Sequence, residues 1–156
     1  MDPIERRNRW QYDRGNEVDI DRLLTILKYY EGRHNFICFS GALERNERRS
    51  GVVKTTTRTV TKVRLVCEED DNKISEQKLY RIDIYLEGAL YKMVRNMVST
   101  ALDVSRGWLE EEVFLDMLHR PEELKLSRKD NPCMPAPPHG LTLERVYYPD
   151  DCDMKF

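Results

Sequence analysis

Four basic side chains, Arg33, Arg58, Lys92 and Arg95, are candidates for binding an anion. A guanidinium stays charged and presents a planar fork that can hold a carboxylate or a phosphate through two hydrogen bonds. Arg95 lies beside the apolar stripe of a helix predicted over residues 89–105 rather than opposite it, which by its position alone is weak support for a binding role. The alternative is that all four are ordinary charges on a solvated surface.

The cysteines and histidines do not have the spacing of a zinc site. No pair of cysteines has the C-x-x-C arrangement, and the three histidines do not cluster with them. We therefore expect no metal ion. Free thiols in a reducing intracellular compartment (cytoplasm, nucleus or organelle) are the simplest interpretation, and a structural disulfide is the alternative. The cysteines are Cys38, Cys67, Cys133 and Cys152.

The composition is typical of one soluble globular domain. Of the 156 residues, 40% are hydrophobic and 35% are charged. No apolar run approaches the ~20 residues that cross a bilayer, so we expect no membrane partner. The first residues have no apolar stretch like that of a secretory signal. Dedicated nucleic-acid-binding domains are usually strongly basic, whereas the net charge here is -2. Residues 1–66 nevertheless carry an excess of positive charge, which could attract phosphates.

Apolar residues recur at helical spacing in three stretches. The first predicted helix follows Asp19, a good N-terminal cap, and stops at Gly32. The second covers 89–105 and has the longest apolar stripe. The third covers 109–119 and ends before Pro121, with acidic residues in its first turn, where the helix dipole favours them.

Alternating and β-branched residues predict strands over 57–67, 79–86 and 141–148. Phe36, Ile37 and Phe39 suggest a further short strand. The connector 68–77 is acidic and polar, which fits an antiparallel pair better than a crossover. The remaining stretches, 41–51 and 121–138, are predicted loops.

The order of these elements predicts an α+β fold, a mainly antiparallel sheet with helices packed on one face. Residues 1–18 are aperiodic and form a lead-in segment, whereas residues 19–156 form the domain. A sheet of only three confident strands leaves unpaired edges, which suggests that another domain or chain completes it.

Four motifs occur in a characteristic order. Thr57-Arg58-Thr59 is the shortest, and the longest is Leu90-Tyr91-Lys92-Met93-Val94-Arg95-Asn96-Met97-Val98-Ser99-Thr100. The others are Glu31-Gly32-Arg33-His34-Asn35-Phe36 followed by Phe39, and Pro137-Pro138-His139-Gly140-Leu141 with Tyr148-Pro149. Together they resemble the TruA-type tRNA pseudouridine synthases over residues 19–149.

The sequence departs from this family in two places. Ser99 stands where the family usually has glycine. The signature around the family's nucleophile, Gly-Arg-Thr-Asp-Ala-Gly-Val, has no match here, and Asp13-Arg14-Gly15 is not that motif. The family tyrosine that follows this signature has no convincing match either. Because these residues lie upstream in the family, we expect the chain to be the C-terminal half of the pseudouridine synthase catalytic fold.

The resemblance assigns roles to individual residues. It implies that Arg95 pairs with a nucleophilic aspartate that this chain lacks. It implies that Leu141 is an apolar wall of the uracil pocket, and it makes Asn96 and Phe39 candidate substrate-binding residues. The alternatives are strand core for Leu141, a helix-surface or backbone-anchoring amide for Asn96, and core packing for Phe39. Arg58, Lys92 and Arg33 are candidate RNA contacts.

Three functions follow from these residues. The first is part of an enzyme that isomerises uridine to pseudouridine in tRNA without a cofactor, inactive without its other half and commonly homodimeric. The second is a non-catalytic RNA-binding or scaffold module of the same fold. The third, a self-contained enzyme using Asp83 or Asp103, has no motif in its favour.

Overall fold

The computed structural model describes residues 9–41, 43, 51, 55–68 and 78–148. The chain divides into two compact units. The larger comprises residues 14–136, and the smaller comprises residues 1–13 together with 137–156. The larger unit contains the sheet and the α-helices.

The sheet is antiparallel and has the order β1-β2-β3. Its strands are β1 (Gly32–Asn35), β2 (Thr57–Glu68) and β3 (Leu79–Leu86). The predicted strands over 57–67 and 79–86 are therefore confirmed, as is their antiparallel pairing. The register shifts between Val60 and Lys62, a β-bulge that lets both Val60 and Val63 lie in the core. Most of the predicted loop 41–51 and nearly all of the connector 68–77 lie outside the described residues.

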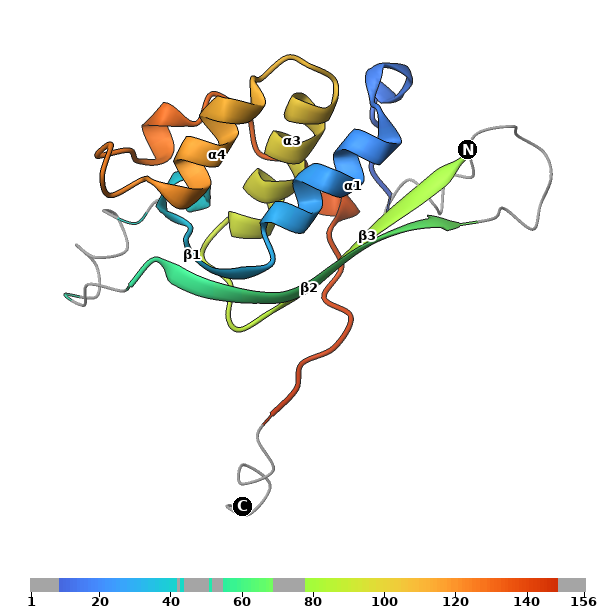
Figure 1. The fold of residues 1–156 in the computed structure, drawn as a ribbon. Coiled ribbons are helices and arrows are strands. Elements are labelled where there is room, and N and C mark those ends of the chain that lie inside the picture. The colour runs from blue at the N-terminus through green and yellow to red at the C-terminus, as the bar shows by residue number, and fades with distance from the viewer. Residues whose placement is uncertain (1–8, 42, 44–50, 52–54, 69–77, 149–156) are drawn as a thin grey trace, which may run out of the picture. The chain divides into compact units, whose positions relative to one another are not determined.

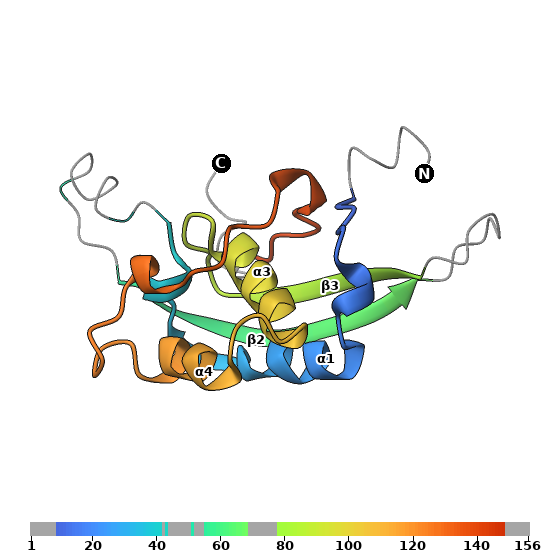
Figure 2. The same cartoon turned by 90° about the horizontal axis from the view of Figure 1, so that it is seen from above.

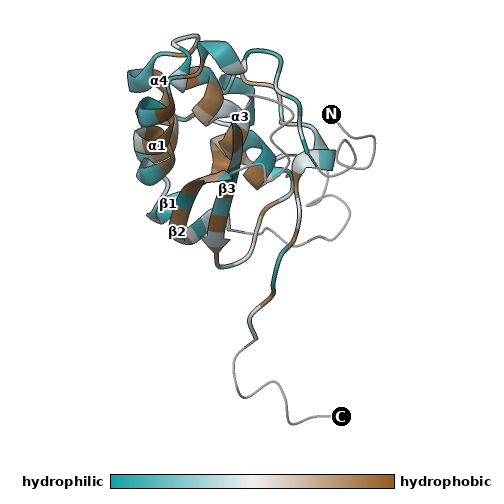
Figure 3. Ribbon diagram, turned by 90° about the vertical axis from the view of Figure 1, so that its right-hand side faces the viewer, coloured by the Kyte–Doolittle hydropathy of each residue, from teal (hydrophilic) through white to brown (hydrophobic). Residues whose placement is uncertain are grey.

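Three helices, α1 (Ile20–Tyr29), α3 (Met93–Ser105) and α4 (Glu111–His119), lie on the same face of this sheet (Figures 1 and 2). Hydrophobic residues concentrate where the helices meet each other and the sheet (Figure 3). The Asp19 carboxylate caps α1 by accepting a hydrogen bond from the Arg22 N–H at 3.0 Å. The α+β class with helices on one face is confirmed. No helix in the described part of the chain is long and apolar enough to cross a membrane.

An aromatic cluster joins the helices to the loop after β1. The Tyr30 ring meets those of Phe39 and Phe114 edge-on, with centroids 5.5 and 5.4 Å apart. All three rings are fully buried. The Tyr30 hydroxyl donates to the Met97 carbonyl at 2.9 Å, so this buried polar group is satisfied inside the core. The cluster therefore fixes α1, α3 and α4 around the same point.

Helix α3 begins four residues later than predicted. Gly88 and Lys92 both have positive φ, +68° and +58°. The turn they form ends with the Met93 N–H donating to the Leu90 carbonyl at 3.0 Å. The apolar stripe extends through this turn because Leu90 is buried like the residues of the helix. Periodicity alone could not separate a buried turn from the first turn of a helix.

The predicted strand at Phe36–Phe39 is wrong. Residues Ile37–Phe39 form a 3-10 helix, and the strand precedes it as β1. The Asn35 side chain causes the change of direction, because its Oδ1 accepts a hydrogen bond from the Ile37 N–H at 3.1 Å. The aromatic residues thus turn into the core instead of continuing the sheet.

The predicted strand over 141–148 is also wrong. This segment belongs to the smaller unit, and in the described residues it pairs with no strand. Strand-like alternation becomes a strand only where a neighbouring backbone supplies hydrogen bonds. Within this unit, Gly140 lies so close to Trp10 that a Cβ there would be 2.9 Å from the Trp10 Cβ.

Glu31 links α1 to β2 and gives a prediction about acid stability. Its carboxylate accepts hydrogen bonds from Lys28 Nζ and from the Val63 N–H, both at 2.8 Å. The hydrogen bond from Lys28, followed by that from Val63, lowers the pKa of the Glu31 carboxyl. A lowered pKa stabilises the folded state above the unfolded pKa of about 4.3, and this contribution is lost as the pH falls through the folded pKa.

We expect Glu31→Gln to lower the midpoint of thermal unfolding by roughly 2–4 °C at pH 7. The difference from the wild type should begin to shrink as the pH falls below about 4.3, the unfolded pKa, and should be lost once the pH falls through the lowered folded pKa. Thermal unfolding followed by circular dichroism between pH 3 and 7 measures this. Glu144→Gln, in the exposed segment 141–148, is the matched control. A difference that did not depend on pH would contradict the proposed ionic link.

Candidate functional site

Arg95 lies in the first turn of α3, where two hydrogen bonds join it to a segment far along the chain. Its Nε donates to the Ala136 carbonyl at 2.5 Å. The Ala136 N–H donates to the Arg95 carbonyl at 3.2 Å. Ala136 is buried and Arg95 is half-buried. This two-point contact fixes both the backbone and the guanidinium of Arg95.

The outer edge of the Arg95 guanidinium remains available. Among the described residues, none accepts a hydrogen bond from Nη1 or Nη2 of Arg95, and none forms an ion pair with it. Since Nε is occupied by a carbonyl, an incoming carboxylate can be held through two hydrogen bonds only by the Nη1–Nη2 pair. The guanidinium is therefore a half-buried positive charge that is fixed at Nε and suited to bind an anion at Nη1 and Nη2.

Asn96, next to Arg95, is buried and fully hydrogen-bonded. Its Nδ2 donates to the Phe39 carbonyl at 2.6 Å, and its Oδ1 accepts from Arg128 Nη2 at 3.4 Å. The Phe39 ring lies in the aromatic cluster, so Phe39 meets Asn96 through its backbone. Ser99, the departure from the family pattern, is buried and donates to the Asn96 carbonyl at 3.1 Å. Asn96 and Phe39 are thus both buried, and their hydrogen bond joins α3 to the loop after β1 next to Arg95.

Lys92 is the left-handed residue that precedes α3. It is half-buried, and its Nζ lies 5.2 Å from the centre of the exposed Tyr91 ring. The Gly41 N–H donates to the Tyr91 carbonyl at 2.8 Å. A Cβ at Gly41 would lie 3.3 Å from the Tyr91 ring and 3.4 Å from Lys92, so glycine permits this close approach. The contact brings residue 41 beside the start of α3.

Arg33 and Arg58, predicted as RNA contacts, line the same surface hollow. The hollow has a volume of about 240 Å³ and is open to solvent. Arg58 is held in place, because its Nη1 donates to the carbonyls of Thr55 and Thr57 at 2.7 and 2.6 Å. Two arginines with hydroxyl groups nearby suit a phosphate, while the carboxylate on the rim limits the net positive charge. The other lining residues are Thr57, Thr59 and Glu87.

Leu141 belongs to the smaller unit. Its side chain is half-exposed, and its N–H donates to the Pro138 carbonyl at 3.1 Å in the turn formed by Pro138–Gly140. An exposed leucine in an unpaired segment is available to a ligand or to another protein surface, whereas a core leucine is not.

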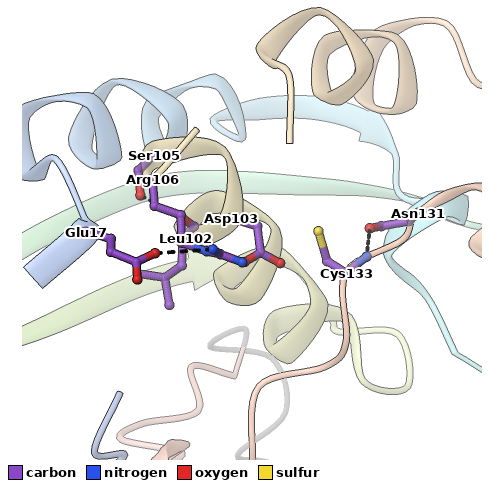
Figure 4. A network of polar contacts seen from close by, with 7 residues as sticks. All are labelled: Glu17, Leu102, Asp103, Ser105, Arg106, Asn131 and Cys133. Carbon is purple, nitrogen blue, oxygen red and sulfur yellow. Dashed lines mark hydrogen bonds and ion pairs between the residues drawn. The ribbon is translucent and has the colours of Figure 1, made fainter. Parts of the chain in front are cut away.

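Both acids of the self-contained-enzyme hypothesis are engaged with arginines. Asp103 accepts from Arg106 Nε at 2.9 Å, and Arg106 also reaches the Glu17 carboxylate at 3.4 Å. Figure 4 shows Asp103 between Arg106 and Cys133. Asp83 accepts from Arg81 Nε at 2.7 Å on strand β3. Neither carboxylate forms an ion pair with Arg95.

Burial raises the pKa of the Cys133 thiol to about 12, and the hydrogen bond to Asp103 contributes in the same direction. Burial also raises the pKa of Cys38 to about 12. Cys38, Cys67 and Cys133 are free thiols, and the two buried ones are poor nucleophiles because the thiolate is disfavoured. Among the described residues, no group of three or more His, Cys, Asp or Glu side chains is placed to hold a metal ion.

The residues that connect Arg95 to its surroundings were missed from the sequence. They are Arg128, Asn131 and Ala136, which lie in the predicted loop 121–138. An asparagine and an arginine near prolines were the available signal, but the contacts that join them to α3, with Thr100 and Asn96, lie 31 and 32 residues away. Sequence spacing carries no information about contacts of that kind.

Comparison with known proteins gives a consistent result. The sequence model of the family described as "tRNA pseudouridine synthase" matches residues 26–149. The chain is 33% identical to tRNA pseudouridine synthase A 2 of Clostridium perfringens, over 94% of this chain and 51% of the relative. It is 31% identical to tRNA pseudouridine synthase A 1 of Protochlamydia amoebophila, over 97% and 51%. The chain thus spans about half the length of the curated relatives it matches.

The buried contacts of Asn96 lead to a stability prediction. Asn96→Ala should lower the free energy of unfolding by about 1–3 kcal/mol, because the Phe39 carbonyl and Arg128 would lose a partner inside the protein. Urea denaturation followed by fluorescence measures this. The exposed Arg33→Ala is the control, with an expected change within about 0.5 kcal/mol. Equal changes in the free energy of unfolding for the two substitutions would show that the hydrogen bonds of Asn96 do not stabilise the fold.

Proposed function

The chain belongs to the tRNA pseudouridine synthase family, and on that premise we propose that it is part of an enzyme that converts uridine to pseudouridine in tRNA. The observation that supports this most directly is the state of Arg95. Its Nε is held by the Ala136 carbonyl, and in the described residues its outer nitrogens have no carboxylate. We propose that this fork pairs with the nucleophilic aspartate of the family, supplied from outside the described residues.

The reaction requires one carboxylate and no cofactor. The N-glycosidic bond of the uridine breaks, the base turns, and a C–C bond forms to the same ribose. A neighbouring guanidinium lowers the pKa of a carboxyl and keeps it ionised in a partly dry cleft, which is the state needed to act as nucleophile or base. The main-chain contact at Ala136 orients the guanidinium before the carboxylate arrives, which reduces the entropy lost on pairing.

Leu141, Asn96 and Phe39 are assigned roles in the uridine site by the same proposal. Leu141 is half-exposed and is proposed as an apolar wall for the uracil ring. Asn96 and Phe39 are buried, and we propose that they contribute by holding α3 next to the loop after β1, which sets the position of Arg95. They are thus positioning residues in this proposal.

We propose that Arg33 and Arg58 contact RNA phosphates at the hollow they share, and that Lys92 does so at the start of α3. The arginines of the hollow come from two neighbouring strands, β1 and β2, so their separation is set by the sheet. Extruding a uridine from a tRNA stem costs a few kcal/mol, and phosphate contacts near the site help to offset that cost.

The proposed partners are tRNA, a second half of the catalytic fold and another copy of the enzyme in a homodimer. We assign residues 19–156 to the C-terminal domain of that fold, with residues 1–18 as its lead-in. Because the chain spans about half of its relatives, the partner half would carry the aspartate.

A non-catalytic RNA-binding module is the second candidate. The hollow with Arg33 and Arg58 favours it, because this hollow is built entirely by the described residues. The two functions differ in one measurable respect. A binding module would retain tRNA without a second half, whereas the enzyme would need that half for turnover.

Release of tritium from tRNA labelled at uracil C5 tests the proposed reaction, because forming pseudouridine displaces the 5-hydrogen. We expect no release from this chain alone. We expect release when the chain replaces the matched half of the Clostridium perfringens relative in a chimaera. Arg95→Ala in that chimaera should lower the rate at least about a hundredfold, since a charged group would be lost from the site.

Two further variants sharpen the result. Arg95→Lys keeps the charge but loses the fork, so its rate should fall between those of the wild type and Arg95→Ala. Arg120→Ala removes an exposed arginine that is paired with Glu123, and it should leave the rate unchanged. Near-normal release by Arg95→Ala would remove Arg95 from the site. Release by the chain alone would place the nucleophile within this chain and contradict the proposal.

The salt dependence of tRNA binding tests the hollow. Arg33→Ala combined with Arg58→Ala should weaken binding about tenfold at low salt and reduce the slope of log K against log salt by about 1 to 2. Filter binding between 50 and 200 mM salt measures both quantities. Arg120→Ala again serves as the control, because it removes one positive charge elsewhere. An unchanged slope in the double variant would exclude the hollow from RNA binding.

A further inference from the structure

Arg128 uses its guanidinium to clamp backbone carbonyls. Its Nη1 donates to the Asn131 carbonyl at 2.6 Å, and its Nη2 donates to the Cys133 carbonyl at 2.8 Å. It opens the 3-10 helix Arg128–Asp130, whose start is fixed by reciprocal hydrogen bonds between Ser127 and Asp130. The side chain is half-buried, and in the described residues it forms no ion pair with a carboxylate. Its charge is therefore used to hold the main chain.

The clamped segment, residues 131–136, is attached to the core through Asn131, through the Cys133 thiol, which is hydrogen-bonded to Asp103, and through Ala136. Asn131 donates from Nδ2 to Thr100 Oγ1 at 3.1 Å and to the Cys38 carbonyl at 3.2 Å. The Cys133 N–H donates to Asn131 Oδ1 at 3.0 Å (Figure 4). Ala136 then meets Arg95 through the two hydrogen bonds described above.

Two prolines restrict the backbone between the residues that Arg128 clamps and Ala136. Pro132 and Pro135 have φ restricted to about −65°, so fixing residues 131 and 133 leaves few conformations for the chain that leads to Ala136. The Ala136 carbonyl is the acceptor for Arg95 Nε. A displacement at the clamp would therefore move the group that orients the Arg95 fork.

Arg128 also reaches α3 directly. Its Nη2 lies 3.4 Å from Asn96 Oδ1, and Asn96 is the neighbour of Arg95. The same guanidinium thus contacts both sides of the Arg95–Ala136 pair, the helix that carries Arg95 and the segment that carries Ala136. Lysine could not replace it, since a single ammonium lacks the planar fork that bridges separate acceptors.

We propose that Arg128 is a positioning residue for Arg95: it fixes residues 131–136 against α3 so that the Ala136 carbonyl holds Arg95 Nε. The importance of this role for catalysis rests on the proposed function, in which Arg95 pairs with the nucleophile. The positioning itself is a property of this chain and can be measured without any enzymatic activity.

Hydrogen exchange of the Arg95 Nε–H, followed by NMR on the full chain with ¹⁵N-arginine, tests the proposal. The resonance is assigned by its loss in Arg95→Lys. In Arg128→Ala we expect it to exchange at least about tenfold faster, with the dispersed backbone spectrum retained, because the carbonyl acceptor is no longer fixed. Arg58→Ala is the matched control, since Arg58 also clamps two carbonyls but lies on β2; it should leave the Arg95 signal unchanged.

Arg128→Lys is the second variant, which retains the charge, and it should accelerate the exchange as well. An unchanged Arg95 Nε–H exchange rate in a folded Arg128 variant would overturn the proposal. Loss of the folded spectrum in both Arg128 variants would assign the residue to folding as a whole and would also overturn it.

In the active chimaera, Arg128→Ala should lower kcat about tenfold with KM unchanged. In the double variant with Arg95→Ala, it should lower kcat little further than Arg95→Ala alone. Additive losses in the double variant would contradict action through Arg95. If no tritium is released by any chimaera, the proposed function fails while the exchange measurement still decides the role of Arg128.

Discussion

The arrangement around Arg95 depends on the buried amide of Asn96. This side chain joins α3 to the Phe39 carbonyl on one side and to Arg128 on the other, and the hydroxyls of Ser99 and Thr100 donate to its backbone carbonyl. A buried amide without partners costs free energy, so α3 cannot rotate or slide without losing these bonds. Since Arg95 is the preceding residue, the helix position that satisfies Asn96 also sets the origin of the Arg95 side chain.

A backbone carbonyl, and no carboxylate of the described residues, contacts the positive charge of Arg95. The Ala136 carbonyl partly compensates the positive charge at Nε and leaves the outer nitrogens unused within the described residues. A half-buried guanidinium has lost part of its hydration, so a carboxylate or phosphate arriving at the free edge would restore what burial removed. This electrostatic demand supports the proposal that an anion from elsewhere completes the site.

Local patterns predicted most of the regular structure. Helical periodicity identified α1, α3 and α4, and β-branched alternation identified β2 and β3, because these signals depend on residues close in sequence. The start of α3 was predicted too early, since the turn between Gly88 and Lys92, both with positive φ, carries the buried Leu90 and so continues the apolar stripe. The segment 141–148 was predicted as a strand because its alternation is strand-like, but pairing is a non-local property.

In the candidate site, too, local features could be predicted from the sequence and long-range contacts could not. Arg95 could be singled out because it lies in a local motif, residues 90–100, that resembles the family's helix; its place beside the apolar stripe was only weak support. Its contact with Ala136 spans 41 residues, and that of Asn96 with Phe39 spans 57, so neither was accessible from spacing. The roles of Arg128 and Asn131 in a proline-rich loop were not predictable either, because most of their partners are backbone carbonyls, which carry no sequence signal, and their side-chain partners Asn96 and Thr100 lie far away in the sequence.

The two carboxylates considered as internal nucleophiles show why the partner of Arg95 is sought outside the described residues. Asp103 is engaged by Arg106 and the Cys133 thiol, and Asp83 by Arg81. Moving either carboxylate to Arg95 would break these hydrogen bonds, and Arg106, whose side chain is only 9% exposed, would lose one of its partners. Within the described part of the chain, Arg95 is held by the Ala136 carbonyl and pairs with no carboxylate, while Asn96 anchors the helix that carries it. This arrangement fits the proposed pairing, in which the aspartate comes from outside the described residues while Arg95 keeps its position.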